Sequence, residues 1–172
     1  MQNRMSILYP NMYLKRVEDI KIDILQKNNI KLLILDVDNT LIDYDGNLSE
    51  SVIKWANEMK SQGIKLYILS NNGDKEKIKS VAKKLGIEDY KYLALKPLKR
   101  GFEYISKDTG INPKNIAVVG DQIFTDIIGG NRSKMFTILV EPIDKEKDYW
   151  YTAWKRPIEN GVKKKIKIRI KF

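Results

Sequence analysis

The sequence has neither cysteine nor histidine, and these two absences restrict its chemistry. Without cysteine the chain has no disulfides, thiolate nucleophiles or zinc–sulfur sites, and without histidine it has no imidazole-based triad or proton relay. The groups left for catalysis are carboxylates, lysines and hydroxyls. A bound metal would be a hard cation with oxygen ligands, which means magnesium, calcium or manganese.

Long hydrophobic runs are missing as well. The longest apolar stretches have only a few residues, whereas a helix that spans a bilayer needs about 20. Residues 1–16 contain no long apolar segment and no small-residue cleavage site, so we expect no secretion signal and a cytoplasmic protein. A length of 172 residues is most simply one domain, which buries roughly 70% of its unfolded surface.

Acidic residues are fewer than basic ones. The sequence has 22 Asp or Glu against 32 Lys or Arg, and its net charge is +10. Residues 143–172 contain ten Lys or Arg and four Asp or Glu, so this segment alone contributes +6. We therefore distinguish a domain over residues 1–142, which includes an N-terminal helix, from a basic, aromatic C-terminal extension over residues 143–172. The extension is expected to pack on this domain or to be appended to it.

Segments with a strand pattern alternate with segments of helical periodicity along the chain. Strands are predicted at 30–36, 64–70, 90–95, 116–121 and 135–140, helices at 17–28, 49–63, 71–86, 98–110 and near 125–130, and a tight hairpin at 43–48. This alternation predicts an α/β fold: a three-layer, Rossmann-like domain with a parallel sheet of about five strands and right-handed crossovers.

The stretch LLILDVDNTL ends a buried strand with two acidic residues. Asp36 and Asp38 point to the same side of an extended chain, where two carboxylates repel unless one is protonated or a cation lies between them. Ligands of parallel sheets bind beyond the carboxyl ends of the strands. Ser70, Lys96 and Asp121 also follow or end predicted strands, so these polar groups are expected to converge.

Asp126 adds another carboxylate five residues after Asp121, in GDQIFTD. A divalent cation would neutralise a cluster of these carboxylates, and this favours a bound cation over a protonated carboxyl group. Magnesium shares its coordination positions with substrate phosphate, so an acidic pocket that also contains a lysine and a hydroxyl group suits phosphoryl transfer.

The same residues resemble the four motifs of the haloacid dehalogenase (HAD) superfamily of phosphohydrolases. DxDxT stands at Asp36–Thr40, the small hydroxyl residue at Ser70, the lysine at Lys96 and GDxxxxD at Gly120–Asp126, so the likeness spans about residues 30–140. LDVDNTL, LSNN and VGDQIFTDIIGGNR are similar to subclass IIIA and its YqeG-type and phosphatidylglycerophosphate phosphatase group. Singly the motifs are weak, since Lys96 is one of 26 lysines, but their joint order favours a functional site.

The resemblance implies a role for each of these residues. Asp36 would attack phosphorus and form an aspartyl-phosphate, and Asp38 would protonate the leaving alkoxide and then activate water. Ser70 and the following amides, beginning at Asn71, would bind phosphate oxygens. Lys96 would offset the negative charge on Asp36 and on the phosphoryl group.

The resemblance also implies a magnesium site. Asp36, Asp121 and the backbone carbonyl of Asp38 would hold Mg²⁺. Asp126 would support this site, and Thr40 would shape the turn after the first strand.

No separate lid domain is expected. Only 31 residues separate Asp38 from Ser70 and 25 separate Ser70 from Lys96, and the predicted elements occupy both intervals. A lidless member of the superfamily would act on a large substrate or borrow a cover from a partner subunit. In the group named above, the reaction would remove the terminal phosphate from phosphatidylglycerophosphate and leave phosphatidylglycerol.

The C-terminal extension suggests an anionic partner independently of the motifs. It combines the aromatic residues Trp150, Tyr151 and Trp154 with Lys155, Arg156 and an alternation of basic and apolar residues over 163–172. Such a segment favours an anionic membrane surface, with about 1 kcal/mol for each basic residue close to it. An alternating strand that packs on the core, with lysines that prevent edge-to-edge association, explains the pattern equally well.

Two other functions fit parts of the sequence. A phosphatase of soluble sugar phosphates or nucleotides would use the same motifs, although the missing lid counts against it. A basic RNA-binding protein that retains a HAD fold would use the cationic, aromatic extension. Nucleic acid is not the expected partner, because all four motif positions hold competent residues. The sequence gives no indication of the oligomeric state.

Overall fold

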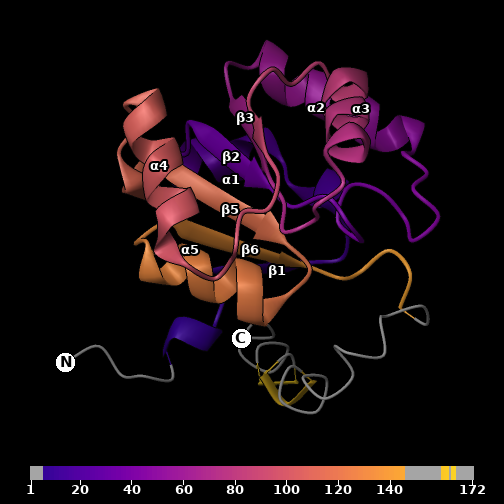
Figure 1. Cartoon of the computed structure of the whole chain (residues 1–172). Helices are drawn as coiled ribbons and strands as arrows, with labels where there is room; N and C mark the ends of the chain where they lie inside the picture. Colours follow the sequence, from indigo (N-terminus) through magenta and orange to yellow (C-terminus); the bar gives the residue numbers. More distant parts are fainter. Residues whose placement is uncertain (1–5, 146–159, 163, 166–172) are drawn as a thin grey trace.

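A computed structural model describes residues 6–145, 160–162, 164 and 165 (Figure 1). Its strands are β1 (Met12–Leu14), β2 (Leu32–Leu35), β3 (Lys65–Leu69), β4 (Tyr90–Lys91), β5 (Ile116–Gly120) and β6 (Phe136–Val140). Its α-helices are α1 (Ile22–Lys27), α2 (Glu50–Ser61), α3 (Lys75–Leu85), α4 (Lys99–Thr109) and α5 (Ile128–Arg132). Short helices are η1 (Ser6–Leu8), η2 (Val17–Asp19), η3 (Pro113–Asn115) and η4 (Ile123–Ile127), of which η4 is a π-helix.

The strands form one parallel sheet in the order β1-β6-β5-β2-β3-β4. Helices α2 and α3 cover one face of this sheet, and α4 and α5 cover the other (Figure 1). The predicted three-layer α/β fold is therefore confirmed. In a parallel sheet every strand ends at the same edge, so the loops that follow β2, β3 and β5 meet there.

The continuous apolar run in β2 follows from its central position in the sheet. Leu33 and Leu35 pack in the core on the α2 and α3 side, whereas Leu32 and Ile34 pack on the α4 side. Successive side chains of a strand point to opposite faces, so a strand covered on both sides needs apolar residues at every position. β5 is buried along its whole length for the same reason.

Two sequence predictions fail on the N-terminal side of β2. The predicted helix over 17–28 is wrong in its middle, because the chain is extended at Ile20 between η2 and α1. There the indole Nε1 of Trp55 donates a hydrogen bond of 3.0 Å to the carbonyl oxygen of Ile20, a long-range contact with no local sequence signal. The edge strand β1, which pairs with β6, was not predicted because it has only three half-buried residues.

Two further predictions need correction near the ends of the sheet. The strand predicted at 90–95 stops at Lys91, because Leu93 and Leu95 adopt left-handed backbone conformations with φ of 50° and 55°. The helix predicted near 125–130 begins as η4 and becomes α-helical only at Ile128. The predicted hairpin at 43–48 is confirmed by an antiparallel bridge between Ile42 and Leu48.

Part of the C-terminal extension packs on the domain. Residues 160–162, 164 and 165 are helical, and Val162 is only 8% exposed in an apolar cluster with Ile123, Ile127 and Leu139. Trp150, Tyr151, Trp154, Lys155, Arg156 and residues 166–172, on which the membrane interpretation depends, lie outside the described residues. Among the described helices none has the length and apolar character needed to cross a bilayer.

We expect Gly129→Ala to lower the free energy of unfolding by about 1–3 kcal/mol. A methyl group at Gly129 would overlap the ring of Phe102, which is fully buried between α4 and the sheet. Urea denaturation followed by circular dichroism measures the change. The control is Gly161→Ala, where an added Cβ meets no atom within 4 Å; equal stabilities of the two variants would contradict this account of the packing.

Candidate active site

Polar side chains gather where three neighbouring strands end. Asp36 directly follows β2, Ser70 follows β3 and Asp121 follows β5. Lys96 comes from the loop between β4 and α4, and Asp126 comes from η4. These side chains are buried or nearly so, which is unusual for charged groups and requires that they satisfy one another.

Lys96 lies between two carboxylates at the centre of the site. Its Nζ is 2.6 Å from Oδ1 of Asp36 and 2.6 Å from Oδ1 of Asp126. The side chain of Lys96 is 3% exposed, that of Asp36 is 12% exposed and that of Asp126 is 1% exposed. In such a dry setting a charged group without its partner is strongly destabilising, so these contacts fix the positions of all three.

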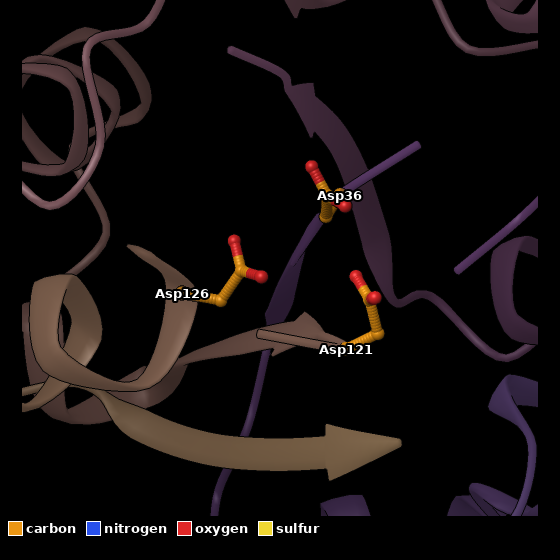
Figure 2. Close-up of side chains that lie close together, drawn as sticks. All are labelled: Asp36, Asp121 and Asp126. Carbon is orange, nitrogen blue, oxygen red and sulfur yellow. The ribbon is translucent and has the colours of Figure 1, made fainter. Parts of the chain in front are cut away.

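Asp121 completes a group of three carboxylates with Asp36 and Asp126 (Figure 2). One carboxylate oxygen from each of the three lies within 4.8 Å of the others. Three carboxylates and one ammonium leave two uncompensated negative charges, which a divalent cation with oxygen ligands would balance. The donor set therefore fits a hard divalent metal ion.

Burial and mutual repulsion perturb the titration of this cluster. Burial raises the pKa of Asp36 to about 6, although the charge of Lys96 opposes the shift. Burial and the charges of Asp36 and Asp126 raise the pKa of Asp121 well above its usual range. Burial alone would lower the pKa of Lys96, but the charges of Asp126 and Asp36 outweigh it and raise the pKa. The lysine therefore stays charged, while Asp36 and Asp121 resist ionisation until a cation joins them.

Thr40 lies between the carboxylates of Asp36 and Asp121. Its hydroxyl Oγ1 lies 3.2 Å from Oδ1 of Asp121 and 3.4 Å from Oδ2 of Asp36. The intervening turn needs a left-handed residue, which is Asn39 with φ of 60°. Three successive amides, of Thr40, Leu41 and Ile42, approach the carbonyl oxygen of Val37 and coil this loop over the strand end.

Gly120 has no side chain because Asp126 occupies that space. A Cβ at Gly120 would overlap the carboxylate of Asp126. The same carboxylate accepts a hydrogen bond of 3.3 Å from the backbone amide of Gln122. The spacing of GDxxxxD thus places the first turn of η4 directly over the glycine.

Asp38 lies apart from the three carboxylates. Its Oδ1 is 2.7 Å from Nζ of Lys77, and its Oδ2 accepts a hydrogen bond of 2.9 Å from Nδ2 of Asn72. Its side chain is 32% exposed, so it faces the open side of the site. The metal contact predicted for Asp38 was through its backbone carbonyl, and this stays a prediction.

Ser70 and Asn71 follow β3, as predicted. Ser70 is buried, and its Oγ accepts a hydrogen bond of 3.1 Å from the amide of Asn72. The side chain of Asn71 makes a reciprocal pair of bonds with the backbone of Lys96, of 2.7 Å to its amide and 3.1 Å to its carbonyl oxygen. Asn71 therefore fixes the loop that delivers Lys96, and its predicted contact with phosphate stays a prediction.

The sequence interpretation did not single out Lys77 or the side chain of Asn72. Asn72 is part of LSNN, two residues after Ser70, so a turn that returns toward the strand end could have suggested it. Lys77 carried no signal among 26 lysines. It reaches Asp38 only because α3 begins beside the carboxyl edge of the sheet.

An open cavity adjoins the catalytic loop. Its volume is about 390 Å³, and Thr40 and Leu41 form part of its wall. Lys15 and Arg16, which follow β1, line another part. The cavity thus lies beside the loop after β2, on the side toward β1, and the three carboxylates and Lys96 do not line it.

A parallel α/β sheet with these carboxylates and a buried lysine at its carboxyl edge agrees with a phosphatase of the haloacid dehalogenase type. Residues 1–144 match the family described as mitochondrial PGP phosphatase, and the chain belongs to that family.

Curated relatives agree with this assignment. A Bacillus subtilis protein named probable phosphatase YqeG is 35% identical over 159 residues, which cover 92% of this chain and 91% of the relative. The Arabidopsis thaliana protein named phosphatidylglycerophosphate phosphatase 1, chloroplastic/mitochondrial, is 25% identical over 169 residues. That alignment covers 93% of this chain but 48% of the plant protein.

Solved structures support the fold. An uncharacterised protein from Listeria monocytogenes superposes with a TM-score of 0.55 at 23% identity and covers 69% of this chain and 84% of its own. A hypothetical protein from Xanthomonas campestris gives a TM-score of 0.51 at 13% identity and covers 82% of this chain and 78% of its own.

We expect the stability of the metal-free protein to fall as the pH rises from about 4 to about 7. Burial raises the pKa of Asp36 from its ordinary value of 3.8 to about 6 in the folded protein, so folding favours the protonated form between these two values, and this contribution is lost as the pH rises through them. Added Mg²⁺ should therefore raise the melting temperature more at the higher pH. Differential scanning calorimetry with chelator and with Mg²⁺ measures both effects.

The matched variant in this experiment is Asp36→Asn, which cannot ionise. Its melting temperature in chelator should depend less on pH than that of the unmodified chain. Equal Mg²⁺-induced shifts at both pH values would contradict a metal site built on these carboxylates.

Proposed function

We propose that the protein is a Mg²⁺-dependent phosphomonoester hydrolase that acts through an aspartyl-phosphate on Asp36 and removes the terminal phosphate of phosphatidylglycerophosphate. The observation that carries the proposal is the buried contact of Lys96 with Asp36 and Asp126, which leaves net negative charge beside Asp121. Such a site suits a metal ion and a phosphate together.

Asp36 is the proposed nucleophile. Lys96 holds its Oδ1, and the second oxygen lies near Thr40, so the carboxylate has a fixed orientation at the strand end. An oxygen of Asp36 attacks phosphorus, and the bond from phosphorus to the ester oxygen breaks. Lys96 stays charged throughout and stabilises the negative charge that develops on the phosphoryl oxygens.

Asp38 is the proposed proton carrier. It gives a proton to the departing ester oxygen in the first step, then takes one from the water that attacks the aspartyl-phosphate and frees Asp36 and phosphate. Asn72 and Lys77 hold its carboxylate at the open side of the site, two residues along the loop from the nucleophile. These two side chains orient Asp38 until the substrate enters.

The proposed metal ligands are Asp36, Asp121 and the backbone carbonyl of Asp38, with Asp126 in support. A bound Mg²⁺ would lower the electrostatic barrier between a phosphate dianion and the attacking carboxylate. The fixed positions of the three carboxylates, rather than any rearrangement of the loops, would set its place.

Three features support a lipid substrate. The matched family is described as mitochondrial PGP phosphatase, and the plant relative is named phosphatidylglycerophosphate phosphatase 1. Residues between Asp38 and Lys96 form a hairpin, α2, β3, α3 and β4, which leaves no room for a separate lid within that interval. The cavity of about 390 Å³ beside Thr40 adjoins the carboxylate group and offers room for parts of the substrate other than the reacting phosphate. A phosphatase of soluble esters would use the same site. The assay described next distinguishes this alternative from a lipid phosphatase.

The test measures phosphate release from phosphatidylglycerophosphate in mixed micelles and from a panel of soluble phosphate esters, with Mg²⁺ and with chelator. We expect preference for the lipid, loss of turnover in chelator, and a loss of at least about a thousandfold in Asp36→Asn, because the nucleophile is gone. Circular dichroism of that variant checks its fold.

Other outcomes of the same assay contradict the proposal in different ways. Equal turnover of soluble esters would favour a soluble substrate. Substantial activity in Asp36→Asn would contradict the assignment of Asp36 as the nucleophile. No turnover of any ester together with salt-sensitive RNA binding would favour a nucleic-acid-binding protein that keeps the fold.

Deletion of residues 163–172 is expected to reduce sedimentation with anionic vesicles, because this segment supplies six basic residues to a negative surface. The proposed localisation is therefore cytoplasmic and peripheral at the membrane. Vesicles of neutral lipid are the control. If the deletion variant binds anionic vesicles to the same extent as the unmodified chain, residues 163–172 do not contribute to membrane binding.

A further inference from the structure

Large apolar side chains are exposed mainly at one edge of the sheet. Among the described residues, the large hydrophobic side chains that are exposed are Tyr44 (42%), Leu93 (57%), Leu95 (65%), Leu98 (52%), Tyr104 (45%) and Ile143 (48%). All except Tyr104 belong to loops that follow the carboxyl ends of β2, β4 and β6. We call Tyr44, Leu93, Leu95, Leu98 and Ile143 the apolar rim. The active site opens at the same edge.

The three leucines of the apolar rim belong to the loop that delivers Lys96. Leu95 precedes this lysine and Leu98 follows it by two residues. Leu93 and Leu95 both have positive φ, which is uncommon for a bulky residue and is retained only where the surroundings enforce it. The enforcing contacts are the hydrogen bonds from the amides of Leu93 and Ala94 to the carbonyl oxygens of Asn72 and Ser70.

These anchors have a consequence for the leucine side chains. The backbone is tied to the loop after β3, and Lys96 is drawn inward by its two carboxylates. The leucines on either side therefore point outward and cannot turn into the core without loss of the catalytic contacts. The leucine side chains are therefore exposed because the same backbone conformation places Lys96 between its carboxylates.

The other two members of the apolar rim are tied to the catalytic loop after β2. The amide of Ile143 donates to the carbonyl oxygen of Asn39 over 3.1 Å. The amide of Tyr44 donates to Asp144, whose own amide donates to Oδ1 of Asn39. Apolar side chains thus stand on three separate loops, and two of these, after β2 and β4, also carry residues of the candidate active site.

Exposed positive charge lies beside the leucines. Lys99 and Arg100 are exposed at the start of α4, directly after Leu98. Residues 90–100 contain no Asp or Glu, and Lys96, which is buried between two carboxylates, does not add to this exposed charge. Exposed apolar side chains beside exposed cations are the combination that binds an anionic lipid surface.

We propose that the apolar rim docks the active-site edge of the sheet onto an anionic lipid bilayer, with Leu93, Leu95 and Leu98 inserted among the lipids. This inference rests on the proposed function for its account of the substrate. A head group that remains in the bilayer would meet Asp36 without leaving it. The bilayer would also cover the site and exclude water, which a lid domain does in other enzymes.

A second copy of the chain fits the rim less well than a bilayer does. Two such rims brought face to face would bring Lys99 and Arg100 of both copies into one interface, and like charges repel. An anionic surface instead pairs with them. The charge pattern therefore favours lipid as the occupant of this face.

The test compares the full-length chain with Leu95→Asn/Leu98→Ser in sedimentation with vesicles of equal parts phosphatidylglycerol and phosphatidylcholine at low salt. Asparagine tolerates the left-handed backbone at Leu95, so the variant should fold normally. We expect partitioning onto vesicles to fall about tenfold, because two apolar side chains no longer insert. Turnover of a soluble phosphate ester should be unchanged, whereas turnover of the lipid in vesicles should fall.

The matched control is Tyr104→Ser. Tyr104 has similar exposure but lies on α4, about 9 Å along the helix from Leu98 and away from the sheet edge. This variant should sediment as the unmodified chain does. Asp36→Asn should also sediment normally, since binding is measured without substrate, so failure of the phosphatase proposal and failure of the docking proposal give different results.

Four results would overturn the docking proposal. They are failure of the unmodified chain to sediment, undiminished sedimentation of Leu95→Asn/Leu98→Ser, equal loss in Tyr104→Ser, or a dimer in solution that Leu95→Asn/Leu98→Ser abolishes while vesicle binding persists. The last result would assign the apolar rim to a second copy of the chain.

Discussion

The position of Lys96 is the constraint on which the rest of the site depends. A buried ammonium needs its carboxylate partners, and Asp36 and Asp126 need the ammonium equally, so none of the three can move alone. The carboxylates come from two different segments, the end of β2 and the first turn of η4. One lysine therefore holds together parts of the chain that are 90 residues apart, and Gly120 exists as a glycine because this arrangement leaves no space for a side chain.

The sequence was sufficient to predict the α/β fold and to predict that polar residues meet at the carboxyl ends of the central strands. Continuous apolar runs identified the central strands, and the polar residues after them had to meet because parallel strands share an edge. Failures occurred where the conformation depends on distant partners. Ile20 is extended because Trp55 binds its carbonyl oxygen, and Leu93 and Leu95 are left-handed because another loop holds the backbone. Lys77 was not identified because only the start of α3 brings it to Asp38.

The loop between β4 and α4 combines two properties that usually conflict. It must be rigid to keep Lys96 in place, and the reciprocal bonds with Asn71 supply that rigidity. It also exposes leucines, which a soluble surface would normally replace with polar residues. Both properties are compatible because hydrogen bonds at backbone amides and carbonyls hold this loop, which leaves the leucine side chains largely exposed.

Val162 connects the far end of the chain to this chemistry. Its side chain rests against Ile123 and Ile127, the apolar side of the same short helix whose other side carries Asp126. Among the described residues of the C-terminal extension, Val162 thus helps to hold the turn that carries Asp126. A binding event that pulled this residue away would open a hydrophobic gap against that turn.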